Sequence, residues 1–444
     1  MILLLHEVKL TIPSAETKQA QILNRKISKI NGRIKEEESA DPSVVNSLYS
    51  QLDSARSEYQ SFQDALYVTH PELRVGSGHT PTLRPDDIDT LTRDRETAYV
   101  EYVVSKGQVH LFVLTASRSN MSPDLKVYPI VIDSEVLARK VNEFHQRLAN
   151  KHPDFANAAQ ELYGLLIKPA ADQLRGTRTL CIVPDGFLWE LPFQALITAN
   201  DRYLLEDYAL YYAPSLTVLR EMAKQKSRNE KTNEELIAFG NPVIGKDNKR
   251  DADICPLPEA ETEVAAISKI FSPQASKVFI GREASEKSFK ALAPSYSTIH
   301  LATHGVIDNK QPLYSHLLLT KTDGDAENDG LLEGREIMNM KLDADLAILS
   351  ACETGNGKIS PGEGIIGMSW AFFVAGTRSM LVSQWKVNSA STSELMVSFY
   401  RARKKGQPGE KARALREAAM RTMRDQRYRH PLYWAGFVLV GSNQ

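Results

Sequence analysis

The chain has few cysteines, almost no net charge and no long apolar run, and each scarcity excludes a class of protein. Three cysteines, all far apart in 444 residues, do not form a disulfide framework or a zinc cluster, and they fit a reducing cytoplasm. A formal net charge of -1 gives no basic surface for nonspecific nucleic-acid binding. No run approaches the ~20 apolar residues that span a bilayer, and residues 1–10 lack the features of a secretory signal. We therefore expect a cytoplasmic protein that binds neither membranes nor nucleic acid directly.

The sequence is that of a globular protein with more than one domain. Hydrophobic residues make up 42% and charged residues 25% of the chain, and the length predicts two or three domains. Between residues 14 and 68, apolar residues recur at alternating steps of three and four, with a break at Asp41 and Pro42. We predict a helical hairpin within residues 1–72, either coiled-coil-like or the end of a repeat array. Residues 73–94 are rich in Gly, Pro and Asp and are a predicted linker.

The rest of the chain alternates strands with helices. Two predicted strands around a turn at residues 106 and 107 open a first α/β half, residues 95–235. A second half, residues 236–444, has short apolar strands separated by amphipathic helices. The predicted strands lie at 235–240, 277–281, 297–303, 345–351 and 379–385. Strands joined by helices predict an α/β fold with a mainly parallel sheet that is covered on both faces.

Two of these strands lead into residues that can carry out covalent catalysis. His304 and Gly305 follow one strand, and Cys352 follows another. Because ligand sites lie at the carboxyl ends of parallel strands, the imidazole and the thiol would face each other if the strands are neighbours. A histidine activates a thiol whose ordinary pKa of ~8.5 makes it a weak nucleophile at neutral pH. We expect Gly305 to turn the backbone sharply, so that its N–H joins that of Cys352 in an oxyanion hole.

Several long motifs resemble the CHAT domain, a bacterial relative of caspases and separases that often follows tetratricopeptide repeats. The matching pieces are HLATHG, LAILSACETGNG, GEGIIGMSWAFFVAGTRSMLVSQWKV, SELMVSFYRARKKG and HPLYWAGFVLVG, with IVPDGFLWELPFQAL, YYAPSLTVL and LPEAETEVAAISKIF upstream. The resemblance implies a caspase-hemoglobinase α/β/α sandwich, a catalytic dyad of His304 and Cys352, and an oxyanion hole at Gly305 and Cys352. The separation of the dyad, 352 - 304 = 48 residues, is close to the ~50 of caspases. The first half would then be a non-catalytic buttress.

Two departures from these families concern substrate preference. Ser350 and Ala351 precede Cys352 where caspases carry a glutamine-containing signature, so a strict preference for aspartate is not supported. Separases follow the tryptophan that matches Trp385 with acidic residues, which receive a substrate arginine. Here Lys386 and Asn388 follow it, and Lys386 would repel a basic side chain. We assign Trp385, Lys386 and Asn388 to a candidate specificity pocket for a neutral or acidic residue before the cleaved bond.

Other polar residues near the dyad have simpler interpretations. His300 lies on the same predicted strand face as His304 and is a candidate supporting group, although a core histidine explains it as well. Glu353 and Glu363 are candidates to tune the dyad, but acids at such positions more often begin a helix. Cys181 and Cys255 are expected to be buried structural cysteines. No phosphate-binding loop or metal motif occurs, so we expect no cofactor and no metal.

These features predict a cysteine endopeptidase that cleaves a protein partner. We expect its activity to be released by a regulatory protein partner or an upstream repeat domain, as in related peptidases. The alternative is a catalytically silent or inhibited scaffold that acts as an interaction module. Labelling of Cys352 by a thiol-reactive peptide ketone separates the two hypotheses.

Overall fold

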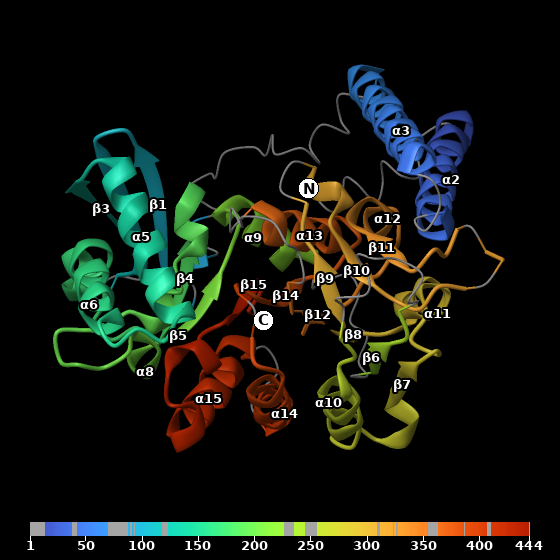
Figure 1. Cartoon of the computed structure of the whole chain (residues 1–444). Coiled ribbons are helices and arrows are strands. Elements are labelled where there is room, and N and C mark those ends of the chain that lie inside the picture. The colour runs from blue at the N-terminus through green and yellow to red at the C-terminus, as the bar shows by residue number, and fades with distance from the viewer. Residues whose placement is uncertain are drawn as a thin grey trace.

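A computed structural model shows a helical hairpin beside one large sheet with helices on both sides (Figure 1). It describes residues 14–37, 42–69, 88, 91–92, 94–117, 123–225, 235–244, 255–308, 311–322, 324–325, 327–350, 352–353, 363–385, 387–405 and 410–443. Within these ranges, every helix is too short or too polar to span a bilayer.

Across the described residues, the large sheet has 11 strands in the order β3-β2-β1-β4-β5-β15-β14-β12-β8-β6-β7. The strand bounds are Thr97–Ser105 (β1), Gln108–Ala116 (β2), Pro123–Val131 (β3), Thr179–Val183 (β4), Ala209–Tyr212 (β5), Leu236–Pro242 (β6), Ser276–Gly281 (β7), Thr298–Ala302 (β8), Leu346–Leu349 (β12), Ser379–Ser383 (β14) and Phe437–Gly441 (β15). Strands β14, β12, β8, β6 and β7 are parallel, and so are β1, β4, β5 and β15. The two parallel sets meet at the antiparallel pair β14–β15. The predicted α/β fold with a mainly parallel sheet is confirmed.

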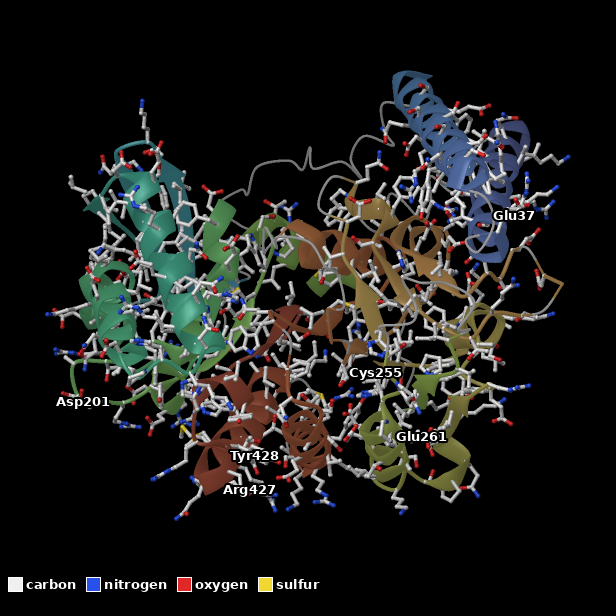
Figure 2. All side chains as sticks on the ribbon, in the orientation of Figure 1. Glu37, Asp201, Cys255, Glu261, Arg427 and Tyr428 are labelled. Carbon is white, nitrogen blue, oxygen red and sulfur yellow. The ribbon has the colours of Figure 1, made fainter. Side chains whose placement is uncertain are left out.

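Helices cover both faces of this sheet. The helix bounds are Ser14–Glu37 (α2), Pro42–Thr69 (α3), Ser134–Ala149 (α5), Phe155–Leu166 (α6), Ala171–Leu174 (α7), Leu204–Asp207 (α8), Leu216–Gln225 (α9), Pro258–Ser268 (α10), Glu286–Leu292 (α11), Gly334–Met338 (α12), Glu363–Val374 (α13), Ser389–Lys405 (α14) and Lys411–Arg424 (α15). Helix α14 contacts both α10 and α15, so the three helices form one layer. Figure 2 shows Glu261 on α10 and Tyr428 just beyond α15 on the same side of the sheet. Helices α12 and α13 lie on the other side in Figure 1.

Most predicted elements are observed, including the hairpin and the first strand pair. Helices α2 and α3 meet near the predicted break at Asp41 and Pro42. Strands β1 and β2 pair around Lys106 and Gly107. Strands β3, β5 and β15 were not predicted from the sequence, and neither was a small second sheet. That sheet has the order β11-β10-β9-β13 and consists of Leu331–Glu333 (β11), His316–Leu318 (β10), His304–Val306 (β9) and Cys352–Glu353 (β13).

A partly buried carboxylate anchors the second half at the edge opposite the small sheet. Asp345 lies just before β12, and its two carboxylate oxygens contact three cations. They are Arg378 Nη2 at 2.7 Å, Arg403 Nη2 at 3.0 Å and Lys411 Nζ at 3.0 Å. Burial alone would raise the pKa of the Asp345 carboxyl, but the three positive charges outweigh it and lower this pKa. The charge cluster ties β12 to β14, α14 and α15.

The helical hairpin packs on the second half through an apolar cluster. The apolar residues that were predicted from the helical spacing are buried between the two helices: Leu23, Ile27, Ile30 and Ile34 from α2, and Leu48, Leu52, Ala55 and Tyr59 from α3. Tyr314, which precedes β10, completes this cluster from the second half. The Arg56 guanidinium lies 4.1 Å from the centre of the Tyr314 ring. Apolar burial therefore fixes where the hairpin sits.

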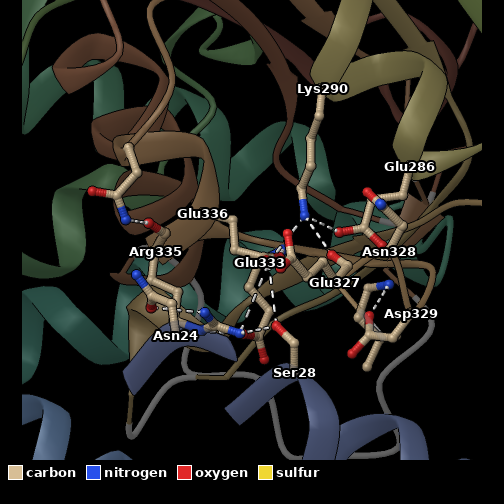
Figure 3. Close-up of polar contacts among 12 residues, drawn as sticks. Asn24, Ser28, Glu286, Lys290, Glu327, Asn328, Asp329, Glu333, Arg335 and Glu336 are labelled. Atoms are coloured by element: carbon tan, nitrogen blue, oxygen red, sulfur yellow. Dashed lines mark hydrogen bonds and ion pairs between the residues drawn. The ribbon is translucent and has the colours of Figure 1, made fainter. Parts of the chain in front are cut away.

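Buried charges join the same two parts (Figure 3). Arg335 on α12 is 2% exposed, and it donates hydrogen bonds to Asn24 Oδ1 at 2.8 Å and Ser28 Oγ at 3.2 Å on α2. The guanidinium also contacts the Glu333 carboxylate, which accepts a hydrogen bond from Asn31 at 3.1 Å. Strand β11, which contains Glu333, is joined through β10 to β9. The hairpin is thus attached to the small sheet.

Candidate active site

The two strands that lead to His304 and Cys352 are neighbours. Strands β8 and β12 pair in parallel, with Ile348 opposite His300 and Leu349 opposite Leu301. Both strands are buried along their length, as expected for apolar strands covered on both faces. The chain continues from their carboxyl ends into β9 and β13 of the small sheet.

The small sheet brings the backbones of His304 and Cys352 side by side. Strands β9 and β13 are parallel, with Cys352 opposite His304 and Glu353 opposite Gly305. Adjacent strands lie about 4.8 Å apart. For Cys352 and Glu353 the structure describes the backbone, so the catalytic role predicted for Cys352 and the tuning role considered for Glu353 stay predictions.

His304 is held by a backbone carbonyl that comes from a distant segment. The imidazole is 6% exposed, and its Nε2 lies 2.8 Å from the carbonyl oxygen of Cys255. Because a carbonyl oxygen only accepts hydrogen bonds, this contact assigns the proton of the neutral ring to Nε2. The basic nitrogen of the neutral ring is then Nδ1. A carbonyl in this place orients the ring.

Cys255 itself differs from the prediction. Cys181 is buried as expected, and burial raises the pKa of its thiol well above the ordinary range. Cys255, however, is exposed, so its assignment to the buried cysteines is wrong. The residue stands before Pro256 in an exposed segment that leads into α10. Its backbone carbonyl could not be predicted as the partner of His304, because every residue type carries a carbonyl.

Gly305 also differs in its backbone conformation. It lies inside β9, opposite Leu317 on one side and Glu353 on the other. Its backbone φ is not among the positive values found at other glycines. The sharp turn expected at this glycine is therefore not present, because the strand continues through it.

His300 is a core histidine whose two ring nitrogens are both hydrogen-bonded. It is fully buried on β8, and its Nε2 lies 2.8 Å from Glu263 Oε1. Its Nδ1 lies 3.2 Å from the Tyr400 hydroxyl. These contacts connect β8 to α10 and α14.

The residues assigned to the specificity pocket are placed in part. Trp385 is 6% exposed, and its Nε1 donates to the Leu432 carbonyl at 3.1 Å. Asn388 Oδ1 accepts from the Ser391 N–H at 3.0 Å and so caps α14. Lys386 lies outside the described residues. Their part in specificity stays a prediction.

The two remaining candidate residues are acidic. Glu363 is the first residue of α13, a position where an acid suits the helix dipole, and Glu353 lies in β13. For both residues the structure describes the backbone. Among the side chains that the structure describes, no group of three or more His, Cys, Asp or Glu gathers in a way that would hold a metal ion.

Comparison with known families agrees with the resemblance found in the sequence. A family model described as "CHAT domain" matches residues 156–442, which is more than half of the chain. Tetratricopeptide repeat protein 28 from Homo sapiens is 25% identical over 325 residues, which cover 64% of this chain and 13% of that protein. The Mus musculus protein of the same name is 25% identical over 326 residues. The chain therefore spans about an eighth of the length of these relatives.

Two solved structures are similar to this chain at low identity. The Saccharomyces cerevisiae separase-securin complex matches with a TM-score of 0.40 and 13% identity, over 96% of this chain and 27% of that chain. The complex of the pro- and mature domains of Porphyromonas gingivalis RgpB matches with a TM-score of 0.39 and 10% identity, over 70% of this chain and 76% of that chain.

Proposed function

Because the chain belongs to the CHAT domain family, we propose that it is a cysteine endopeptidase with Cys352 as nucleophile and His304 as proton carrier. The observation that supports this most is the register of the small sheet, in which Cys352 is the partner of His304. Partners in adjacent strands present their side chains on the same face, about 5 Å apart. A thiol and an imidazole in that relation are within reach of a proton transfer.

In the proposed reaction, His304 Nδ1 takes the proton of the Cys352 thiol. The thiolate attacks the peptide carbonyl carbon, and a tetrahedral oxyanion forms as the C=O π bond opens. The imidazolium then gives its Nδ1 proton to the leaving amine as the C–N bond breaks, which leaves a thioester on Cys352. Water then attacks the thioester while His304 takes a proton from it. The C–S bond breaks, the carboxylic acid leaves, and His304 returns the proton to the Cys352 thiolate.

The Cys255 carbonyl has a defined part in this scheme. It accepts the Nε2–H of His304 at 2.8 Å, so it keeps Nδ1 turned toward the thiol and stabilises the imidazolium. An acceptor on the far nitrogen is the arrangement that an active histidine requires.

For specificity, we propose a neutral or acidic side chain before the cleaved bond. The positive charge of Lys386 beside Trp385 and Asn388 disfavours a basic side chain there. Cleavage of a peptide library by the chain measures the preference. Dominance of Arg or Lys at that position would contradict the proposal.

A second candidate function is a regulated scaffold. It is supported by the match to Tetratricopeptide repeat protein 28, whose name refers to a repeat domain and of which this chain spans 13%. The docked hairpin offers a place through which a protein partner or an upstream repeat domain could act on the small sheet. In this function the chain binds its partner without cleaving it.

A search for new protein N-termini in cells tests the proposal. Cells that express the parent chain are compared with cells that express Cys352→Ala or His304→Ala, and Cys255→Ser serves as the matched cysteine control. We expect a set of cleavage sites with the parent and with Cys255→Ser that is absent with the other two. If Cys352→Ala produced the same sites as the parent, the nucleophile would be wrong, and if no chain produced any, the scaffold would be favoured.

A further inference from the structure

We infer that Asn241 is a positioning residue, which holds the Cys255 carbonyl against the imidazole of His304. The inference rests on the proposed function, because it assigns to Asn241 a role in the basicity of His304. It concerns the segment from Cys255 to Glu261, at the start of α10, which Figure 2 marks at both ends.

The Asn241 side chain bridges two groups of that segment. Its Oδ1 accepts the Leu257 N–H at 2.7 Å, and its Nδ2 donates to Glu261 Oε1 at 2.7 Å. Leu257 is the residue that caps α10, and it stands two residues after Cys255. The Asn241 amide thus uses both its acceptor and its donor group on the segment whose carbonyl accepts a hydrogen bond from His304.

The backbone at Asn241 is shaped to make this bridge. Its φ is +47°, in the left-handed region that residues other than glycine adopt at a cost of about 1 kcal/mol. It is the extra residue in an irregularity of β6, between Gly240 and Pro242. Such bulges turn a side chain away from its regular direction. At Gly240 a Cβ would lie 2.8 Å from Val264 Cγ2, so only glycine lets α10 approach the strand this closely.

The segment is stiff enough for one anchor to control the carbonyl. Pro256 and Pro258 fix their own φ angles, and each proline disfavours the helical conformation for the residue before it, Cys255 or Leu257. A hydrogen bond at the Leu257 N–H therefore also sets the direction of the Cys255 carbonyl.

A second connection ties the same helix to the strand that leads to His304. Glu263 on α10 is 3% exposed and pairs with His300 on β8 at 2.8 Å. Helix α10 is thus held at β6 by Asn241 and at β8 by Glu263. The Glu263 pair fixes the body of the helix, while the Asn241 bridge acts on the segment that carries the carbonyl.

The test measures how the reactivity of Cys352 depends on pH. A merely structural role of Asn241 would leave this pH dependence unchanged. Alkylation of Cys352 by iodoacetamide is followed by mass spectrometry from pH 5 to 10. All chains carry Cys255→Ser, which keeps the carbonyl but removes the exposed thiol. Asn241→Gly is the main variant, because glycine keeps the positive φ and loses both hydrogen bonds. His304→Ala supplies the reference profile without the imidazole.

We expect Asn241→Gly to slow alkylation near pH 6.5 by roughly tenfold and to move the profile toward that of His304→Ala. The double variant Asn241→Asp, Glu261→Gln restores the bridge with carboxylate and amide exchanged, and it should recover most of the rate. If Asn241→Gly does not fold, Asn241→Ser replaces it, since its hydroxyl is too short to bridge both groups, and the same loss is expected.

Each result has a distinct meaning. A parent-like profile for Asn241→Gly, or a double variant as slow as Asn241→Gly, overturns the role of Asn241 and leaves the dyad standing. A parent profile identical to that of His304→Ala removes the dyad itself, and with it the proposed function.

Discussion

Replacing Arg335 with Met should detach the hairpin, because this side chain joins α2 to the small sheet (Figure 3). The guanidinium makes hydrogen bonds of 2.8 and 3.2 Å to Asn24 and Ser28, and it contacts the Glu333 carboxylate. Both members of that ion pair have side chains that are 1% exposed. Removing one member of a buried ion pair costs about 3–5 kcal/mol, since the other charge stays buried. We expect a loss of that size in the free energy of unfolding.

Two companion variants show whether burial is the reason. Arg33→Met removes an arginine of α2 instead, but Arg33 is 47% exposed and lies 3.4 Å from Glu37, so this change should cost less than about 1 kcal/mol. Adding Glu333→Gln to Arg335→Met removes the stranded charge and should recover about 1–2 kcal/mol.

Urea unfolding followed by circular dichroism gives these free energies, and hydrogen exchange locates the loss. Increased exchange is expected in α2 and α12, which meet at Arg335. The reasoning is refuted if Arg335→Met lies within about 1 kcal/mol of the parent. It is also refuted if the double variant is as unstable as the single one.

Two further predictions concern charge and the cysteines. Asp345→Asn should cost about 3 kcal/mol at pH 7, because three cations lose their partner. The lowered pKa of Asp345 means that its contribution is present above the unfolded value of ~3.9 and is lost as pH falls through the folded value, so acid unfolding curves of parent and variant should converge. Cys255→Ser should cleave peptides at the parent rate, since only the backbone carbonyl of this residue is used, whereas Cys352→Ser should be inactive. Loss of cleavage in Cys255→Ser would contradict the assignment.

The strands and helices could be predicted because their side chains carry the signal. The apolar spacing of α2 and α3 and the buried runs of β8 and β12 appear directly in the sequence. The place of β15 between the two parallel sets of strands was not predicted, because an apolar run does not show that the strand pairs antiparallel with β14 and parallel with β5. Strand β5 has four residues, too few for a clear pattern.

The candidate site could be predicted only where it depends on side-chain identity. His304 and Cys352 were singled out as residue types at strand ends, and the structure sets their backbones side by side. The acceptor for His304 is a main-chain carbonyl 49 residues away, and no residue type indicates such a group. The burial of Glu333 and Arg335 was likewise hidden, because charged residues are normally exposed and their pairing depends on the docked hairpin.

The most direct test of the central claim is the distance between Cys352 Sγ and His304 Nδ1 in a crystal structure of the chain at neutral pH. We predict a separation of about 4 Å or less, with Nε2 still bonded to the Cys255 carbonyl. A separation beyond about 8 Å, with the two side chains on unconnected surfaces, would contradict the account.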